Sequence, residues 1–144
     1  MPKWCVLACE EYTKRLGAYS ASVIEIPLAK RHKNGNALDY KTQEGKKLLE
    51  KITPKDHVIA LDVLGKSWST PLLSEQLSQW KQSGKNLAFI IGGPDGLCQK
   101  ILQRANQVWS LSELTLPHHL AKVLLLEQLY RADSMLNNHP YHRE

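Results

Sequence analysis

The chain has 144 residues, of which 42% are hydrophobic and 23% charged, and its 19 basic and 14 acidic residues give a net charge of +5. This length allows one domain with its own core, and the composition is typical of a globular protein. No apolar run approaches the roughly 18 residues of a membrane span, and the N-terminus lacks the pattern of a secretion signal. We therefore expect a cytoplasmic protein with no membrane partner.

The predicted elements alternate between helices and strands. Helices are expected at 2–16, 38–52, 70–83, 97–105 and 118–134, strands at 22–26, 57–62, 87–91 and 108–110, and loops at 63–69, 111–117 and from 137 onward. Thr70 followed by Pro71 is typical of a helix start, and Gly84 of a helix end. This order predicts an α/β fold, a mainly parallel sheet flanked by helices, in one domain over residues 1–144.

The three cysteines are Cys5, Cys9 and Cys98. An odd number in a chain without a secretion signal favours free thiols, which we expect to be buried. No Cys and His spacing of a zinc site occurs, and we expect no metal.

Three predicted strand ends would meet at one edge of a parallel sheet, where ligands of open α/β sheets bind. They are Leu61-Asp62, Gly92-Gly93 and the loop that starts at Leu111. The segment Gly92-Gly93-Pro94-Asp95-Gly96 fits a tight turn and a ligand site equally well. It lacks the G-x-G-x-x-G pattern, and no phosphate-binding P-loop occurs, so dinucleotide and ATP chemistry are disfavoured.

Basic residues gather in two groups. The block Lys30-Arg31-His32-Lys33 lies in a turn-rich segment, where phosphate contact and simple solvation are equally consistent with the pattern. The lysines at 46, 47, 51 and 55 fit the solvated face of a helix. A net charge of +5 by itself indicates a polyanionic partner only weakly.

The last residues carry groups that core packing does not explain, namely His139, Tyr141, His142 and Arg143. Histidine exchanges protons near neutral pH, and arginine binds phosphate through paired hydrogen bonds. A disordered tail is the alternative.

At several motifs the chain resembles the small bacterial methyltransferases of the SPOUT superfamily that modify large-subunit ribosomal RNA. The matching segments are 11–16, 61–62, 65–66, 68–71, 91–96 (Ile-Gly-Gly-Pro-Asp-Gly), 114–118 (Leu-Thr-Leu-Pro-His), 127–132 and 138–144 (Asn-His-Pro-Tyr-His-Arg-Glu). They cover nearly the whole chain in the same order, and the last three together are highly specific.

This resemblance implies a homodimer whose subunits each tie a C-terminal trefoil knot around S-adenosyl-L-methionine. It places the cofactor contacts on Leu61, Gly92, Leu111, Ser112, Glu113, Leu114, Thr115 and Leu116. The implied reaction is methylation of N3 of a pseudouridine in 23S rRNA of assembled ribosomes. Two departures from the family are a first strand that is missing before Met1 and a charged residue, Glu113, whose side chain we expect to point outward.

Methylation of an imide nitrogen requires its deprotonation, so the tail residues become candidates for catalysis. We expect His142 to act as the base, Tyr141 to stack on or hydrogen-bond the pyrimidine, and Arg143 to bind phosphate or a carbonyl. Two alternatives stay open: a SPOUT methyltransferase acting on another RNA such as tRNA, and a non-catalytic RNA-binding or ribosome-assembly factor.

Overall fold

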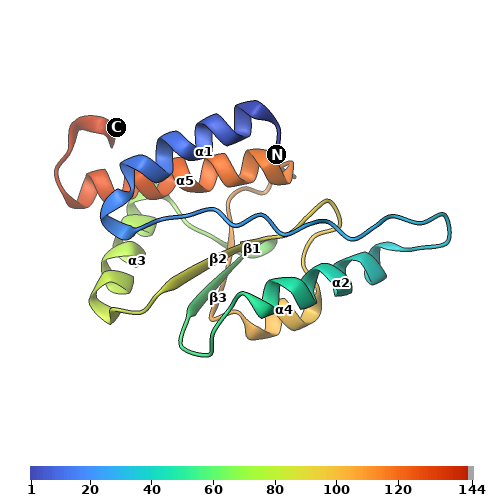
Figure 1. Ribbon diagram of the computed structural model, residues 1–144. Coiled ribbons are helices and arrows are strands. Elements are labelled where there is room, and N and C mark those ends of the chain that lie inside the picture. Colours follow the sequence, from blue (N-terminus) through green and yellow to red (C-terminus); the bar gives the residue numbers. More distant parts are fainter. Residues whose placement is uncertain (143–144) are drawn as a thin grey trace. The chain divides into compact units, whose positions relative to one another are not determined.

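The computed structural model describes residues 1–142. Its elements in chain order are α1 (Lys3–Arg15), η1 (Gly17–Tyr19), α2 (Ala37–Glu50), β1 (His57–Ser67), α3 (Thr70–Ser83), β2 (Leu87–Ile91), α4 (Gln99–Arg104), β3 (Gln107–Ser110), α5 (His118–Leu136) and η2 (Pro140–His142) (Figure 1). The described helices include none that is long and apolar enough to cross a membrane.

The chain divides into two compact units. We call residues 25–67 and 85–118 the sheet unit, and residues 1–24, 68–84 and those from His119 onward the helical unit. The prediction of a single domain over 1–144 stays a prediction.

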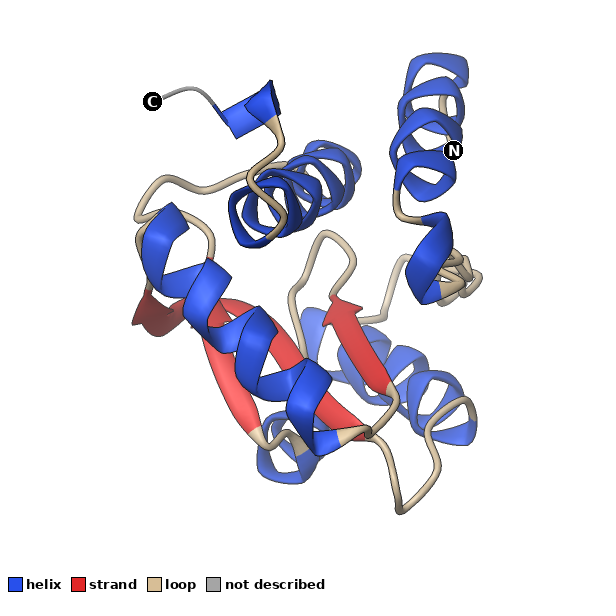
Figure 2. Cartoon of the chain, turned by 90° about the vertical axis from the view of Figure 1, so that its left-hand side faces the viewer, coloured by secondary structure: helices blue, strands red, loops and turns tan. Residues whose placement is uncertain are grey.

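The sheet unit contains a three-stranded sheet in the order β2-β1-β3, and β1 pairs with both neighbours in parallel (Figure 2). The register aligns Leu61 of β1 with Ile91 of β2 and with Trp109 of β3. The predicted α/β architecture with a parallel sheet is therefore confirmed.

Helices α2 and α4 run beside each other along the sheet, and their apolar side chains pack against it (Figure 1). Val58 and Ala60 of β1, Ile90 of β2 and Ile101 of α4 are buried in this core, joined by Leu48, Leu49 and Ile52 from α2 and the turn that follows it. The buried side chains of α2 and α4 lie on one face of each helix, and those of β1 alternate along the strand and so lie on one face of the sheet. Helices α2 and α4 therefore pack against the same face of the sheet.

Strand β1 is longer than predicted, because the expected loop at 63–69 is mostly strand. Trp109 pairs with Leu61 and again with Lys66, so the four residues between them form a bulge. Gly65 permits this return, since a Cβ there would lie 2.7 Å from the carbonyl oxygen of Val108. The close approach of two backbones thus requires glycine at this position.

The helical unit contains α1, α3 and α5. Cys5, Cys9 and Leu16 of the N-terminal part form a buried cluster with Leu126 of α5. Ser74 of α3 donates a hydrogen bond from Oγ to the carbonyl of Ala132 (3.1 Å). The predicted limits of α3 are nearly correct, with Ser69 in place of Thr70 as the capping residue and Gly84 in the left-handed conformation at the end.

All three cysteines are free and buried, as expected. Burial, together with Cys5 3.9 Å away, raises the pKa of the Cys9 thiol to about 11. These side chains pack as small apolar groups.

The predicted strand at 22–26 is wrong, since residues 21–32 have no regular secondary structure. Val23 packs on the helical cluster and Ile24 is 64% exposed, which keeps the alternation of a strand. A strand also needs a neighbour for its N–H and C=O groups, and none pairs with this segment among the described residues.

Candidate functional site

Three segments of the sheet unit converge at one edge of the sheet. Leu61 is paired with Ile91 and Trp109, so Gly92 follows directly beyond one neighbour and Leu111 two residues beyond the other. The structure therefore brings together Leu61, Gly92 and the start of the loop at 111–116, which the sequence singled out as cofactor contacts. The carboxyl edge of a parallel sheet is the usual place for a ligand.

The glycine-rich segment forms a tight turn. Gly96 N–H donates to the carbonyl of Gly93 (3.0 Å), and Gly96 has a φ of 83°, a left-handed conformation. A Cβ at position 92 would lie 2.6 Å from the carbonyl carbon of Gly96. Glycine at 92 is thus needed to close the turn, which confirms the turn interpretation, while a ligand contact stays a prediction.

A buried carboxylate supports this turn from α2. Glu44 is 6% exposed, and its Oε2 accepts hydrogen bonds from the Ala29 main chain (2.9 Å) and the Arg31 guanidinium (2.8 Å). Arg31 also pairs with Asp95 of the turn (2.7 Å). These contacts tie the loop before α2, helix α2 and the glycine turn into one network, which we call the Glu44 network.

Sequence reasoning missed the Glu44 network. Arg31 was grouped with possible phosphate contacts, whereas the structure pairs it with two carboxylates and stacks it on the ring of Tyr40 (4.3 Å). The available signal was position: Glu44 lies four residues from Tyr40 and from Leu48, on the apolar face of the helix. A charged residue at a core position indicates a buried partner.

The second lining segment, residues 111–116, is a loop ordered at its start. Ser110 Oγ donates to the carbonyl of Ser112 (2.9 Å), and Ser112 Oγ accepts from the N–H of Leu114 (3.0 Å). Within the described chain, the N–H groups of Leu111, Glu113, Thr115 and Leu116 donate to no main-chain carbonyl. Glu113 is exposed, as expected.

The tail residues lie in the helical unit, beside the second half of α5. Tyr141 donates from its hydroxyl to Glu127 Oε2 (2.9 Å) and lies 3.2 Å from the hydroxyl of Tyr12. Arg131 pairs with the same carboxylate of Glu127 (2.9 Å). Burial and these hydrogen bonds raise the pKa of Tyr141 above its ordinary value, so its hydroxyl stays protonated at neutral pH.

Both the backbone carbonyl and the ring of His142 have partners in α5. Arg131 donates to its carbonyl (3.4 Å), and Ser134 Oγ lies 3.3 Å from its Nδ1. Ser134 also donates its single hydroxyl hydrogen to the carbonyl of Arg131 (2.7 Å), so it can only accept from His142. The other predicted tail residue, Arg143, lies outside the described residues.

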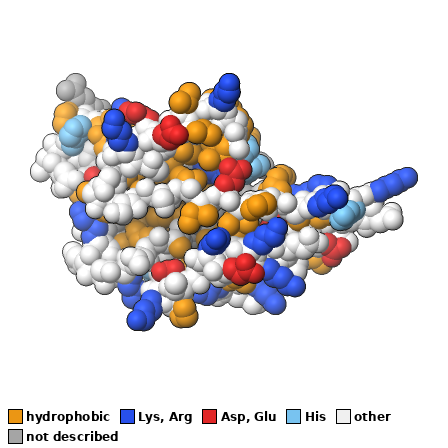
Figure 3. All heavy atoms as spheres, in the orientation of Figure 1, with side chains coloured by type: hydrophobic (Ala, Val, Ile, Leu, Met, Phe, Trp, Pro, Cys, Tyr) orange, Lys and Arg blue, Asp and Glu red, His pale blue; other side chains and the backbone are white. Residues whose placement is uncertain are grey.

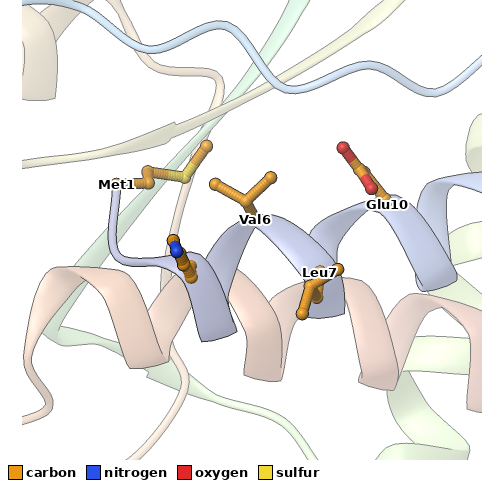
Figure 4. A pocket seen from close by; sticks show the side chains of 5 residues that line it. Met1, Val6, Leu7 and Glu10 are labelled. Carbon is orange, nitrogen blue, oxygen red and sulfur yellow. The ribbon is translucent and has the colours of Figure 1, made fainter.

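A shallow hollow of about 250 Å³ lies on the first helix, lined by Met1, Lys3, Val6, Leu7 and Glu10 (Figure 4). It contains none of the predicted site residues. In residues 1–142 no group of three His, Cys, Asp or Glu side chains is placed to hold a metal ion.

The sheet topology, the three segments that meet at one sheet edge and the order of the motifs all bear on the class of protein. Residues 1–142 match the family described as "Predicted SPOUT methyltransferase", and the chain belongs to this family. Its similarity to individual relatives extends over the whole chain. A protein of Hahella chejuensis named "Ribosomal RNA large subunit methyltransferase H" is 52% identical over 145 residues, which cover 100% of this chain and 93% of that protein.

Proteins of the same name from Saccharophagus degradans and a Marinomonas species are 49% and 48% identical, each over 99% of this chain and 93% of the relative. The family resemblance drawn from the motifs is thereby confirmed.

Proposed function

We propose that this chain methylates N3 of a pseudouridine in 23S rRNA of assembled ribosomes, using S-adenosyl-L-methionine, as a cytoplasmic homodimer. One observation carries the proposal. Leu61, Gly92 and Leu111 meet at one sheet edge in a chain of the SPOUT methyltransferase family. The name that these relatives share supports ribosomal RNA as the substrate.

The residues at this edge fit S-adenosyl-L-methionine. Gly92 itself carries no side chain, and the N–H groups of Leu111, Glu113, Thr115 and Leu116 donate to no main-chain carbonyl of the described residues, so they could bind a flat, polar heterocycle. Leu61, Leu111, Leu114 and Leu116 would supply apolar contacts, and Ser112, Glu113 and Thr115 main-chain hydrogen bonds. When bound, the cofactor supplies an electrophilic methyl group on a sulfonium.

N3 must lose its proton before it can accept the methyl group, so a protein residue must act as the base. We assign the role of base to His142. Because Ser134 accepts from Nδ1, the neutral ring carries its proton there and leaves Nε2 with a free lone pair. No described group hydrogen-bonds Nε2, so this nitrogen is available to take a proton.

The role proposed for Tyr141 differs from that of the base. Its raised pKa and its hydrogen bond to Glu127 keep the hydroxyl protonated and the ring fixed, so it offers an aromatic face and a donor and is unsuited as a base. Arg143 remains the proposed phosphate or carbonyl ligand. The trefoil knot implied by the family stays a prediction.

The homodimer is supported by apolar surface on the first helix. Trp4 is 50% exposed and Leu7 67%, next to the hollow lined by Val6 and Leu7. Large apolar side chains gathered on one helix indicate a protein contact surface.

Two measurements test this function. Calorimetry with S-adenosyl-L-methionine should show micromolar binding, and absence of binding would refute the enzyme assignment. His142→Ala, assayed on ribosomes at saturating cofactor, should lower the methylation rate on the order of 10²-fold or more. A rate for His142→Ala within a few-fold of the parent would remove His142 from the base role.

A further inference from the structure

The net charge of the chain is concentrated in one segment. Residues 30–55 contain eight of the 19 basic residues and three of the 14 acidic ones, a difference equal to the whole net charge of +5. The rest of the chain carries equal numbers of both signs, 11 and 11. This segment is the loop before α2, helix α2 itself and the turn that follows it.

Most of these basic side chains are exposed and have no carboxylate partner. Arg31 is paired within the Glu44 network and is therefore not counted among them. Within residues 30–55, the exposed lysines that pair with no carboxylate of residues 1–142 are Lys30, Lys33, Lys46, Lys47, Lys51 and Lys55. In Figure 3, Lys and Arg side chains gather over α2 and the loop before it. We call these six lysines the α2 basic surface.

The loop part of this surface is held in place from beneath. Tyr40 accepts from the N–H of His32 (2.8 Å) and donates to its carbonyl (3.0 Å), so one side chain fixes both main-chain groups. Arg31 is anchored to the buried Glu44 (2.8 Å). Lys30 and Lys33 therefore project from an ordered loop beside the helix, which lowers the entropy lost when they bind a partner.

We propose that the α2 basic surface binds the phosphodiester backbone of ribosomal RNA and so docks the enzyme on the ribosome. This inference rests on the proposed function, and adds the surface on which the RNA lies. Lysines that neutralise phosphates release counterions, and this release favours binding without reading base sequence. The surface therefore supplies affinity and orientation, while the pseudouridine is selected elsewhere.

The exposed side of α2 also distinguishes RNA from an anionic membrane. A helix that lies on a membrane needs an apolar face to insert. The exposed residues of α2 include only one large apolar side chain, Leu38, and the others are Ala37, Asp39, Thr42, Gln43, Lys46, Lys47 and Glu50. Its other apolar residues pack against the sheet.

The test uses the full-length protein with Lys33→Glu and Lys46→Glu combined. Lys33 lies in the loop and Lys46 within α2, so neither change removes an ion pair among residues 1–142 or a charge in the first or last turn of the helix. The control combines Lys14→Glu and Lys100→Glu, two exposed lysines in α1 and α4, and changes the net charge equally. Binding of each protein to purified ribosomes is measured over a range of salt concentrations, with calorimetry of S-adenosyl-L-methionine in parallel.

The α2 variant should bind ribosomes at least about tenfold more weakly than the parent, with a salt slope reduced by about two, while its cofactor affinity is unchanged. The control should lose less than about threefold. Equal losses in both variants, or parent-like binding of the α2 variant, would overturn the proposal. So would binding to phosphatidylserine vesicles that depends on these lysines, without binding to ribosomes. A parent that binds ribosomes through this surface but not the cofactor would refute the proposed function and leave this inference standing.

Discussion

Glu44 shows how a single buried residue can connect the loop before α2 with the glycine turn. Its Oε2 accepts from Ala29 and Arg31, while Oε1 has no hydrogen-bond partner in the described chain and would lie 3.1 Å from a Cβ at position 93. A buried carboxylate is tolerated only when it is paired. The pair with Arg31 therefore fixes the loop before α2 against the glycine turn.

Glu44→Ala should lower the free energy of unfolding by about 2–4 kcal/mol, because it leaves the buried Ala29 N–H without its acceptor and removes one of the two carboxylates that pair with Arg31. Urea unfolding followed by tryptophan fluorescence measures the loss. Glu50→Ala, an exposed site on the same helix, is the control and should change stability by less than about 0.5 kcal/mol. Equal stability of the two variants would contradict the role assigned to Glu44.

Tyr19 leads to a prediction about alkaline pH. Burial and its hydrogen bond to Asp133 raise the pKa of Tyr19 above the ordinary value of 10.0. The folded state therefore favours the protonated hydroxyl. This contribution to stability is fully present below pH 10 and is lost as the pH rises toward the folded-state pKa.

The free energy of unfolding should thus fall more steeply above about pH 10 in the parent than in Tyr19→Phe, which has no hydroxyl to ionise. Tyr130→Phe is the control, since the Tyr130 hydroxyl makes no hydrogen bond to another described residue. Urea titrations at a series of pH values compare the three proteins. Parallel curves for the parent and Tyr19→Phe would show that this hydroxyl does not contribute.

Among the elements, β1 and its bulge connect fold and site most directly. Residues 62–65 of β1 have no paired residue in β3 between the two pairings of Trp109, and Leu61 stands immediately before them. Asp62 accepts from the N–H of Leu64 (3.1 Å), which shapes the bulge from within. The position of Leu61 at the ligand edge therefore depends on how closely Gly65 approaches β3.

Gly65→Ala should disrupt this pairing, because its Cβ would lie 2.7 Å from the Val108 carbonyl oxygen and 2.8 Å from the Trp109 nitrogen. These atoms belong to the backbone of β3 and cannot move aside as a flexible side chain would. We expect a loss of about 1–3 kcal/mol in stability and, at temperatures where the variant is folded, at least about tenfold weaker cofactor binding.

Gly17→Ala is the matched control, since a Cβ there would meet nothing within 4 Å. It should retain both stability and cofactor affinity. Unchanged cofactor binding by folded Gly65→Ala would show that the bulge does not influence the cofactor site.

Sequence patterns predicted the elements whose signals are local. Thr70-Pro71 and the terminal Gly84 predicted the limits of α3, although the cap is Ser69, one residue before the predicted Thr70. The strand proposed at 22–26 failed because alternation does not reveal whether a pairing partner exists.

The convergence of the candidate contacts was predictable from sheet topology, whereas their contact with a cofactor stays a prediction. Leu61, Gly92 and Leu111 follow from the rule that parallel strands end at one edge. The Glu44 network does not, since it joins residues 13 and 64 positions apart along the chain. The return of β1 at Lys66 likewise depends on a tertiary contact of Gly65.

At the scale of the whole molecule, the proposed homodimer raises the question of which subunit supplies the cofactor contacts and which supplies the tail of each site. The predicted cofactor contacts lie in the sheet unit and the tail in the helical unit. In the dimer we propose, the tail of one subunit serves the cofactor site of its partner. A dimer with two-fold symmetry would then contain two identical composite sites.

Mixing two inactive variants tests this arrangement. Gly92→Ala damages the glycine turn, because its Cβ would lie 2.6 Å from the Gly96 carbonyl carbon, and His142→Ala removes the proposed base. In a mixed dimer one site would combine the intact turn of one subunit with the intact tail of the other. After subunit exchange, about one quarter of all sites should therefore be complete, and methylation of ribosomes should recover to about that fraction. If each tail served its own subunit, every site would carry one defect and mixing would restore nothing. The same mixture kept from exchanging subunits is the control, and it should stay as inactive as the separate variants.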